Sequence, residues 1–166
     1  MLTRRQLLRG DFLAKAYSLA PPWAVRHFTS ACSRCDACVT ACPTGLLIRG
    51  DGGFPRTDYS RSECTFCGDC ATACKDDALR RGDGQAPWSR RILIDDSCLT
   101  RIGVVCRSCG EHCDAQAIRF VAQAGGVANP SLDAAACTGC GACVAVCPNR
   151  AIRVVANTAE FSRRAA

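Results

Sequence analysis

Apolar residues along this chain gather in short runs separated by polar turns. The clearest run is 91–95, where three aliphatic residues follow one another, and a short run bounded by turn residues is typical of a β-strand. Other runs that we expect to be extended lie at 45–48, 78–80, 117–121 and 151–155. Glycine-rich turn signals separate them at 50–53, 82–84 and 125–126. The pattern predicts short elements joined by tight turns.

Short segments of small residues with helical character precede these runs. The segment 141–147 reads Gly-Ala-Cys-Val-Ala-Val-Cys, and we expect it to form a short helix. Each unit therefore runs strand, loop, helix, strand, and it repeats about every 32 to 39 residues. This repeat predicts an α+β fold.

Sixteen cysteines occupy the loops and the short helical segments of this repeat. They form four runs, of which runs one, two and four share the spacing C-x2-C-x2-C-x3-C. Run three has the spacing C-x7-C-x2-C-x3-C, so its first cysteine lies further upstream. In chain order the runs are Cys32, Cys35, Cys38, Cys42; Cys64, Cys67, Cys70, Cys74; Cys98, Cys106, Cys109, Cys113; and Cys137, Cys140, Cys143, Cys147.

This spacing is typical of proteins that bind 4Fe–4S clusters through thiolates, which favour iron–sulfur clusters over hard cations. A disulfide scaffold would scatter its half-cystines, and a tripled C-x2-C-x2-C repeat is unusual for zinc. We therefore expect four 4Fe–4S clusters, with zinc and disulfides as alternatives. Because metal binding then contributes folding free energy, we expect the protein to be largely unfolded without iron and sulfide.

The fourth cysteine of such a run commonly binds the neighbouring cluster. If neighbouring runs pair, the ligand sets are Cys32, Cys35, Cys38 and Cys74; Cys64, Cys67, Cys70 and Cys42; Cys98, Cys106, Cys109 and Cys147; and Cys137, Cys140, Cys143 and Cys113. Nested pairing, of run one with four and two with three, is the alternative. It would explain why proline follows the last cysteine only in runs one and four, as Pro43 and Pro148, whereas Lys75 and Asp114 stand there in the middle runs. We favour neighbouring pairs because short connections are the rule.

The repeat predicts tandem ferredoxin-like modules with two clusters each, in a small iron–sulfur protein. Residues 32–81 would form the first module and residues 91–156 the second. Residues 82–90 would link them. Residues 1–31, which contain no cysteine, would form a separate N-terminal segment, and residues 157–166 a tail.

The N-terminal segment begins Met-Leu-Thr-Arg-Arg-Gln-Leu-Leu-Arg, like a twin-arginine export signal. The apolar region that such a signal needs is interrupted by Asp11 and Lys15 and ends at Pro21. We expect instead a short amphipathic helix over 7–19 and a cytoplasmic protein; export through the twin-arginine route is the alternative. No apolar run is long enough to span a membrane.

The net charge is +6, carried by nineteen Arg and two Lys. The arginines are spread along the chain without interleaved aromatics, so we expect a solvated surface that meets anionic proteins and no nucleic-acid face.

No nucleophile–base set or phosphate loop is present, and we expect no enzymatic activity. His112, directly before Cys113, could be an alternative ligand, but a surface histidine is the simpler interpretation. Asp95 and Asp96 indicate a turn rather than an acid–base pair.

Three stretches together resemble the NapF family, the ferredoxin-type accessory proteins of the periplasmic nitrate reductase system. They are Thr-Arg-Arg-Gln-Leu-Leu-Arg-Gly at 3–10, the second cysteine run at 64–74, and the third run ending Gly-Val-Val-Cys-Arg-Ser-Cys at 103–109. The long gap between Cys98 and Cys106 is the most specific of these features. The resemblance covers nearly the whole chain.

The resemblance implies a cytoplasmic protein with four 4Fe–4S clusters. It would act on the cytoplasmic precursor of the periplasmic nitrate reductase catalytic subunit, assisting maturation of its iron–sulfur site or supplying electrons. We expect residues 1–31 to dock this partner, led by Arg4, Arg5, Leu7 and Leu8. A polyferredoxin electron-transfer subunit of an oxidoreductase is the alternative. A nucleic-acid-binding redox regulator would rest only on the arginine excess.

Overall fold

The computed structural model describes residues 19–156, which divide between two compact units. Of the described residues, unit 1 contains 19–58 and Cys67–Pro87, and unit 2 contains Tyr59–Phe66 and 88–156. The predicted helix up to residue 18, the docking residues Arg4, Arg5, Leu7 and Leu8, and the 157–166 tail lie outside the described residues. Residues 59–66, predicted to belong to the first module, group with unit 2.

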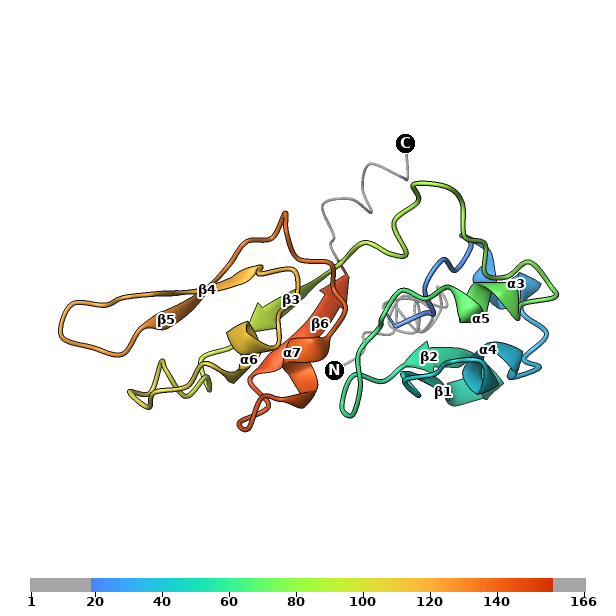
Figure 1. The fold of residues 1–166 in the computed structure, drawn as a ribbon. Helices are drawn as coiled ribbons and strands as arrows, with labels where there is room; N and C mark the ends of the chain where they lie inside the picture. Colours follow the sequence, from blue (N-terminus) through green and yellow to red (C-terminus); the bar gives the residue numbers. More distant parts are fainter. Residues whose placement is uncertain (1–18, 157–166) are drawn as a thin grey trace, which may run out of the picture. The chain divides into compact units, whose positions relative to one another are not determined.

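Unit 1 is built from short elements around one antiparallel strand pair. In chain order they are α3 (Phe28–Ala31), α4 (Ala37–Thr40), β1 (Leu47–Arg49), the 3-10 helix η1 (Asp51–Gly53), β2 (Pro55–Thr57) and α5 (Asp69–Thr72). β1 and β2 lie side by side (Figure 1) and pair with Leu47 opposite Thr57. The expected extended segment 45–48 is confirmed in part by β1.

A further strand-like pairing in unit 1 joins the segment before run one to the segment after run two. Ala24 forms an isolated bridge with Leu79. The amide of Val25 donates to the carbonyl of Ala78 at 3.1 Å, and the amide of Arg80 donates to the carbonyl of Trp23 at 3.0 Å. Residues from the predicted N-terminal segment therefore complete unit 1, and Trp23 is 4% exposed within its core.

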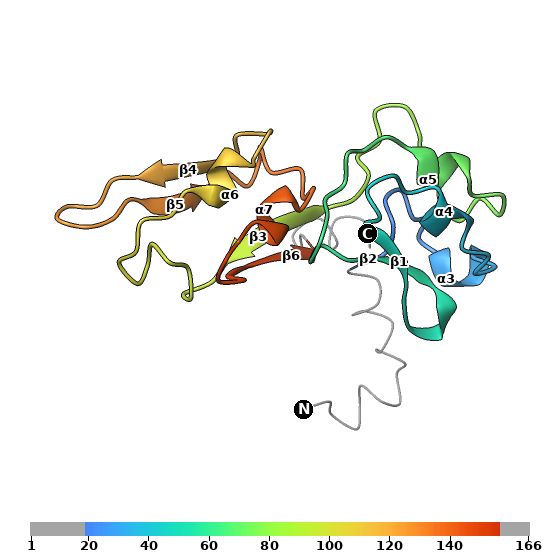
Figure 2. The same cartoon turned by 60° about the horizontal axis from the view of Figure 1, so that its bottom comes forward.

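Unit 2 contains two antiparallel strand pairs and two short helices. In chain order its elements are β3 (Arg90–Ile94), α6 (Ser108–Glu111), β4 (Ile118–Val121), β5 (Asn129–Leu132), α7 (Ala142–Ala145) and β6 (Ile152–Ala156). β3 pairs with β6, and β4 pairs with β5 as a separate ribbon (Figures 1 and 2). The strands expected near 91–95, 117–121 and 151–155 and the helix expected within 141–147 are confirmed.

The core of unit 2 is small and includes cysteines. Ile92, Ile118 and Ile152 are buried together with Cys109 and Cys143. So few aliphatic residues give little hydrophobic stabilisation, because burial of one such side chain contributes only about 1.5–3 kcal/mol. Along residues 19–156, no helix is long and apolar enough to cross a membrane.

Candidate metal centres

The four short helices of the cysteine runs each contain the third cysteine. These residues, one each in α4, α5, α6 and α7, are buried, whereas the other twelve cysteines are partly buried or exposed. A four-residue helix is too short to form stably by itself. Packing within each unit therefore fixes these inward-facing thiols, which are Cys38, Cys70, Cys109 and Cys143.

Residues with left-handed backbone conformation flank the second cysteine in runs one, two and four. The residue before it has φ between 59° and 69°, and the residue after it has φ between 61° and 91°. Such values favour glycine, yet non-glycine residues take three of these six places. The flanking residues are Arg34 and Asp36, Phe66 and Gly68, and Gly139 and Gly141.

Run three lacks this backbone conformation. Arg107, directly after the second cysteine, has φ −134°, and Val105 before it does not have positive φ. The segment between Cys98 and Cys106 forms its own turns, in which the amide of Val104 donates to the carbonyl of Leu99 at 2.8 Å. Displacement of the first cysteine thus accompanies a different loop geometry.

All four runs share one turn after the fourth cysteine. The residue three positions later has positive φ in each run: Gly45, Asp77, Gln116 and Arg150. The turn directs the following amides towards the thiol. The amide of Ala117 donates to Sγ of Cys113 at 3.3 Å, and the amide of Ala151 donates to Sγ of Cys147 at 3.3 Å.

Cys42 shows the electrostatic effect of such amides. Burial raises the pKa of its thiol, but hydrogen bonds from the amide of Leu47 and the hydroxyl of Thr44 lower it, and the net pKa falls below its ordinary value. Hydrogen bonds of this kind stabilise negative charge on sulfur. The site therefore favours a thiolate at this position.

In unit 1, cysteines of runs one and two lie close together. Helices α4 and α5 contact each other. The pKa of Cys38 is raised to about 11, chiefly by burial and then by the charges of Cys32, Cys74 and Cys35. These neighbours include the fourth cysteine of run two and not that of run one, an arrangement compatible with neighbouring pairs.

Unit 2 repeats this arrangement with α6 against α7. One cavity is lined by Cys98, Cys106, Cys109 and Cys147, and another by Cys113, Cys137, Cys140 and Cys143. The pKa of Cys109 is raised to about 11, by burial and then by the charges of Cys98 and Cys106, and that of Cys143 is raised to about 12, by burial and then by the charges of Cys140 in its own cavity and Cys109 in the other. Each cavity combines three thiols of one run with the fourth thiol of the other.

The second predicted ligand set is divided between the units. Cys64 belongs to unit 2, where its amide donates to the carbonyl of Cys140 at 2.9 Å. Cys67, Cys70 and Cys42 belong to unit 1. This ligand set stays a prediction.

The donor chemistry fits a 4Fe–4S cubane. A single tetrahedral zinc would bring sulfurs to about 3.8 Å from each other, since each zinc–sulfur bond is about 2.3 Å. A cubane instead distributes its thiolates over four iron corners. Among residues 19–156, no three His, Cys, Asp or Glu side chains converge on one ion position. Each cavity of unit 2 brings four thiols together among largely apolar residues, as a cubane requires.

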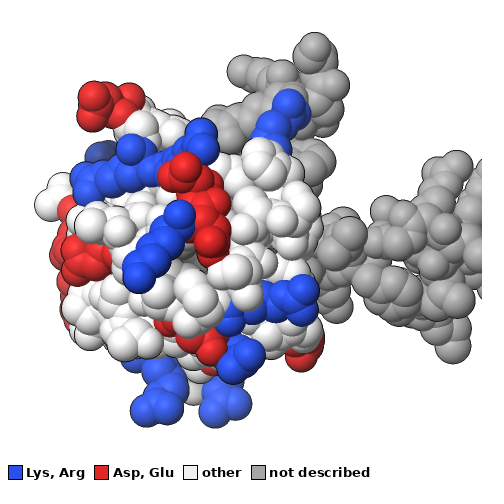
Figure 3. Space-filling view, turned by 90° about the vertical axis from the view of Figure 1, so that its right-hand side faces the viewer, with Lys and Arg blue, Asp and Glu red and all other residues white. Residues whose placement is uncertain are grey.

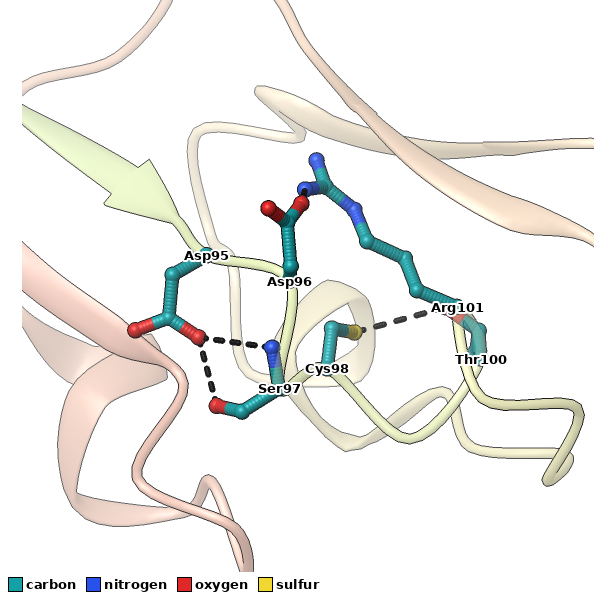
Figure 4. A network of polar contacts seen from close by, with 6 residues as sticks. All are labelled: Asp95, Asp96, Ser97, Cys98, Thr100 and Arg101. Carbon is teal, nitrogen blue, oxygen red and sulfur yellow. Dashed lines mark hydrogen bonds and ion pairs between the residues drawn. The ribbon is translucent and has the colours of Figure 1, made fainter.

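Hydroxyl groups near the ligand sulfurs were not anticipated from the sequence. Oγ1 of Thr100 lies 3.3 Å from Sγ of Cys98, and Oγ1 of Thr44 lies 3.6 Å from Sγ of Cys42. Figure 4 shows the first pair beside the turn that precedes it. In both cases the hydroxyl residue follows the cysteine by two positions, so a C-x-T pattern could have identified them.

Asp95 and Asp96 serve the turn before Cys98. Asp95 Oδ1 accepts hydrogen bonds from the amide and the hydroxyl of Ser97 at 3.0 and 2.5 Å, and Asp96 forms an ion pair with Arg101 (Figure 4). These hydrogen bonds from Ser97 lower the pKa of Asp95. The prediction of a turn with charge patterning is confirmed.

His112 is exposed, with its Nδ1 2.9 Å from the carbonyl oxygen of Ser108. Its exposure agrees with a surface histidine, but it also lines the cavity that contains Cys113, Cys137, Cys140 and Cys143, so a role beside these thiols stays a prediction. On the face drawn in Figure 3, basic and acidic side chains alternate without forming a stripe of one sign. The expectation that nucleic acid is not bound stays a prediction.

Comparisons with known proteins identify relatives. The family described as "4Fe-4S dicluster domain" matches residues 25–79, and the "4Fe-4S binding domain" matches residues 130–153. Run three lies outside both ranges.

Curated relatives match over longer stretches. "Ferredoxin-type protein NapF" of Haemophilus influenzae is 45% identical over 163 residues, covering 91% of this chain and 92% of that protein. Its namesake in Escherichia coli K12 is 38% identical over 161 residues, covering 96% and 94%. A Methanosarcina acetivorans protein, named as part of an ion-translocating oxidoreductase complex, is 37% identical over 139 residues, covering 76% of this chain but 47% of that protein.

Proposed function

Because this chain belongs to the NapF family of ferredoxin-type iron–sulfur proteins, we propose that it assists maturation of the cytoplasmic precursor of the periplasmic nitrate reductase catalytic subunit. It would carry four 4Fe–4S clusters in tandem two-cluster modules and help to assemble the iron–sulfur site of that subunit, or supply electrons to it. It would act in the cytoplasm as a binding and electron-donating protein, not as an enzyme.

The observation that carries the proposal is the grouping of thiols in unit 2. Cys98, Cys106, Cys109 and Cys147 line one cavity, and Cys113, Cys137, Cys140 and Cys143 line the other. The electrostatic neighbours of Cys38 support the corresponding set in unit 1. By the repeat, Cys64, Cys67, Cys70 and Cys42 complete the fourth set.

When bound, the clusters supply one-electron exchange. The chain's own residues control that exchange in two ways. Amides such as that of Ala151, which donates to Sγ of Cys147 at 3.3 Å, stabilise negative charge on the ligand sulfurs. Burial of the third cysteines excludes water from one side of each cavity, and both effects set reduction potentials.

Anaerobic purification with iron and sulfide counting and EPR of the reduced protein tests the cluster content. We expect about sixteen irons per chain. Eight irons or fewer in the anaerobically purified wild type would contradict four clusters.

Co-purification with the unexported catalytic subunit tests the partner. Replacing both Arg4 and Arg5 by Ala should weaken this association while leaving the iron content unchanged. Replacing the exposed Arg119 and Arg153 by Ala, a matched loss of two charges, should leave association intact. Loss of clusters in the first variant would argue against a docking role. Normal nitrate reductase activity without this protein, under both iron limitation and oxygen stress, would refute a role in maturation.

A second candidate function is that of a polyferredoxin electron-transfer subunit. The similarity to a protein named as part of an ion-translocating oxidoreductase complex favours it. Stopped-flow mixing should then show reduction of the clusters by a donor followed by their oxidation by an acceptor enzyme. Clusters that decay within one such cycle would exclude this function.

A further inference from the structure

Arg90 is a buried cation at the start of β3. It is 8% exposed, and among residues 19–156 it is the charged residue that the core contains. Its Nη1 donates a hydrogen bond of 2.7 Å to the hydroxyl of Tyr59, itself 6% exposed. Its guanidinium carbon lies 4.2 Å from the ring centroid of Trp88. Two aromatic residues of the same unit thus fix the position of one positive charge.

The backbone and Cβ of Arg90 lie against the loop that precedes Cys140. A methyl group on Gly139 would stand 2.8 Å from Cβ of Arg90, so the two backbones are in close contact. Trp88 strengthens the same contact, because its Nε1 donates to the carbonyl of Thr138 at 2.9 Å. Arg90 is therefore held against the fourth cysteine run.

Cys64 lies in the same neighbourhood. Its amide donates to the carbonyl of Cys140 at 2.9 Å. Burial lowers the pKa of Arg90, while the charges of Tyr59 and Cys64 raise it. An arginine keeps its proton throughout the accessible pH range, and a buried charge is screened much less than an exposed one.

We propose that Arg90 raises the reduction potentials of the clusters bound by Cys64 and Cys140, so that electrons entering the protein collect there. Reduction adds one electron, from a one-electron donor, to a cluster that is already anionic, and no proton need be taken up. A fixed cation stabilises the reduced form more than the oxidised form. This inference rests on the proposed four-cluster function.

Packing alone does not require a charge at this position. Apolar residues of similar volume often replace buried ions without loss of stability. Methionine could fill the space between Tyr59 and Trp88 without desolvating a cation. The guanidinium therefore provides what an apolar side chain cannot, namely a positive charge that interacts with Cys64, whose amide donates to the carbonyl of Cys140.

EPR-monitored redox titration of the anaerobically purified holo-protein tests the proposal. Arg90→Gln and Arg90→Met remove the charge, Arg90→Lys keeps it, and Arg153→Gln removes a charge from an exposed position on β6. The Cys140→Ser variant identifies the EPR signal of the cluster that Cys140 binds. In the charge-removing variants, we expect the reduction potential of that cluster to shift downwards. The clusters not bound by Cys64 or Cys140 should keep their potentials. Arg90→Lys and Arg153→Gln should resemble the wild type.

Unchanged potentials in an Arg90→Gln or Arg90→Met variant with full iron content would overturn the inference. An equal shift of every cluster, or the same shift in Arg153→Gln, would overturn it too. If both charge-removing variants lose their clusters while Arg90→Lys keeps them, the charge is a structural requirement and the inference fails. A wild type without about sixteen irons would instead contradict the proposed function.

Discussion

The ring of Tyr59 packs directly on the backbone of Gly141, with no room between them for a side chain. Gly141 has φ +88°, and a methyl group placed on it would overlap Cδ1 of Tyr59. Gly141 directly follows Cys140, so this contact fixes the loop of run four. Two constraints, left-handed backbone and an aromatic neighbour, therefore require glycine here.

Gly141→Ala should destabilise the protein by at least about 2 kcal/mol, because backbone strain adds to overpacking. It should also lower the iron content by about four per chain, because run four would lose its geometry. Thermal unfolding and iron counting measure the two effects. Gly125→Ala is the matched control, since Gly125 has φ +68° but nothing within 4 Å. It should cost about 1 kcal/mol and keep all iron; equal behaviour of the two variants would contradict this interpretation.

Double cysteine variants distinguish the pairing schemes. If neighbouring runs exchange their fourth cysteines, Cys106 and Cys147 bind the same cluster, whereas Cys106 and Cys113 bind different ones. The Cys106→Ala/Cys147→Ala variant should then keep about twelve irons and Cys106→Ala/Cys113→Ala about eight. Each variant is the control for the other, because both lose two thiols.

The two alternative pairing schemes predict different iron counts for the same variants. Nested pairing would leave about eight irons in both variants, since Cys113 and Cys147 would then serve runs two and one. Runs that each bind one cluster alone would reverse the expected order. The iron counts of the two variants therefore distinguish neighbouring pairing from both alternatives.

The strands that the sequence predicted are those with consecutive aliphatic residues. β3 and β6 belong to this group, and their pairing of Ile92 with Val154 buries one face. β2 and β5 were missed because each contains proline, which cannot donate to a ladder. Pro55 and Pro130 nevertheless pair with β1 and β4, in two-stranded sheets where every strand is an edge.

Cysteine spacing predicted which thiols belong to one run, but not the conformation of each loop. Asp36 and Phe66 have positive φ although neither is glycine. Their conformation follows from how the loop closes, which depends on residues distant in the sequence. The burial of Arg90 could not be predicted from the sequence either, because its partner Tyr59 is 31 residues away.

Thr100 offers a local test of how ligand sulfurs are tuned. It is 4% exposed, with its hydroxyl 3.3 Å from Sγ of Cys98. Once Cys98 is a thiolate, the hydroxyl is the donor, and donors to a ligand sulfur stabilise the reduced cluster. Thr100→Val, which keeps the shape, should therefore lower the potential of one cluster in an EPR-monitored titration.

Ser97→Ala is the control for this substitution. Ser97 also neighbours Cys98, but it is exposed and its hydroxyl bonds Asp95 instead. It should leave all potentials unchanged. An unchanged potential in Thr100→Val would show that the hydroxyl does not act on the cluster.

Removal of iron should unfold the described part of the chain. Its α-helices are four residues long, and its sheets are two-stranded. Neither kind of element is stable alone in water, and the aliphatic core is small. Anaerobic chelation should therefore abolish the amide-exchange protection of Ile92, and reconstitution with iron and sulfide should restore it. Treatment with the chelator already saturated with iron is the control.

Retained protection of Ile92 in the iron-free protein would contradict that prediction. A folded iron-free protein would also have a stability that depends on pH. Burial, together with the charges of neighbouring cysteines, raises the pKa of Cys143 from 9.0 to about 12. Between these values only the unfolded chain releases the proton, so the stability of a folded iron-free protein would be complete below about pH 9 and fall as the pH rises towards 12. Denaturant unfolding of the iron-free protein across this range distinguishes such a folded state from the unfolded chain that we expect.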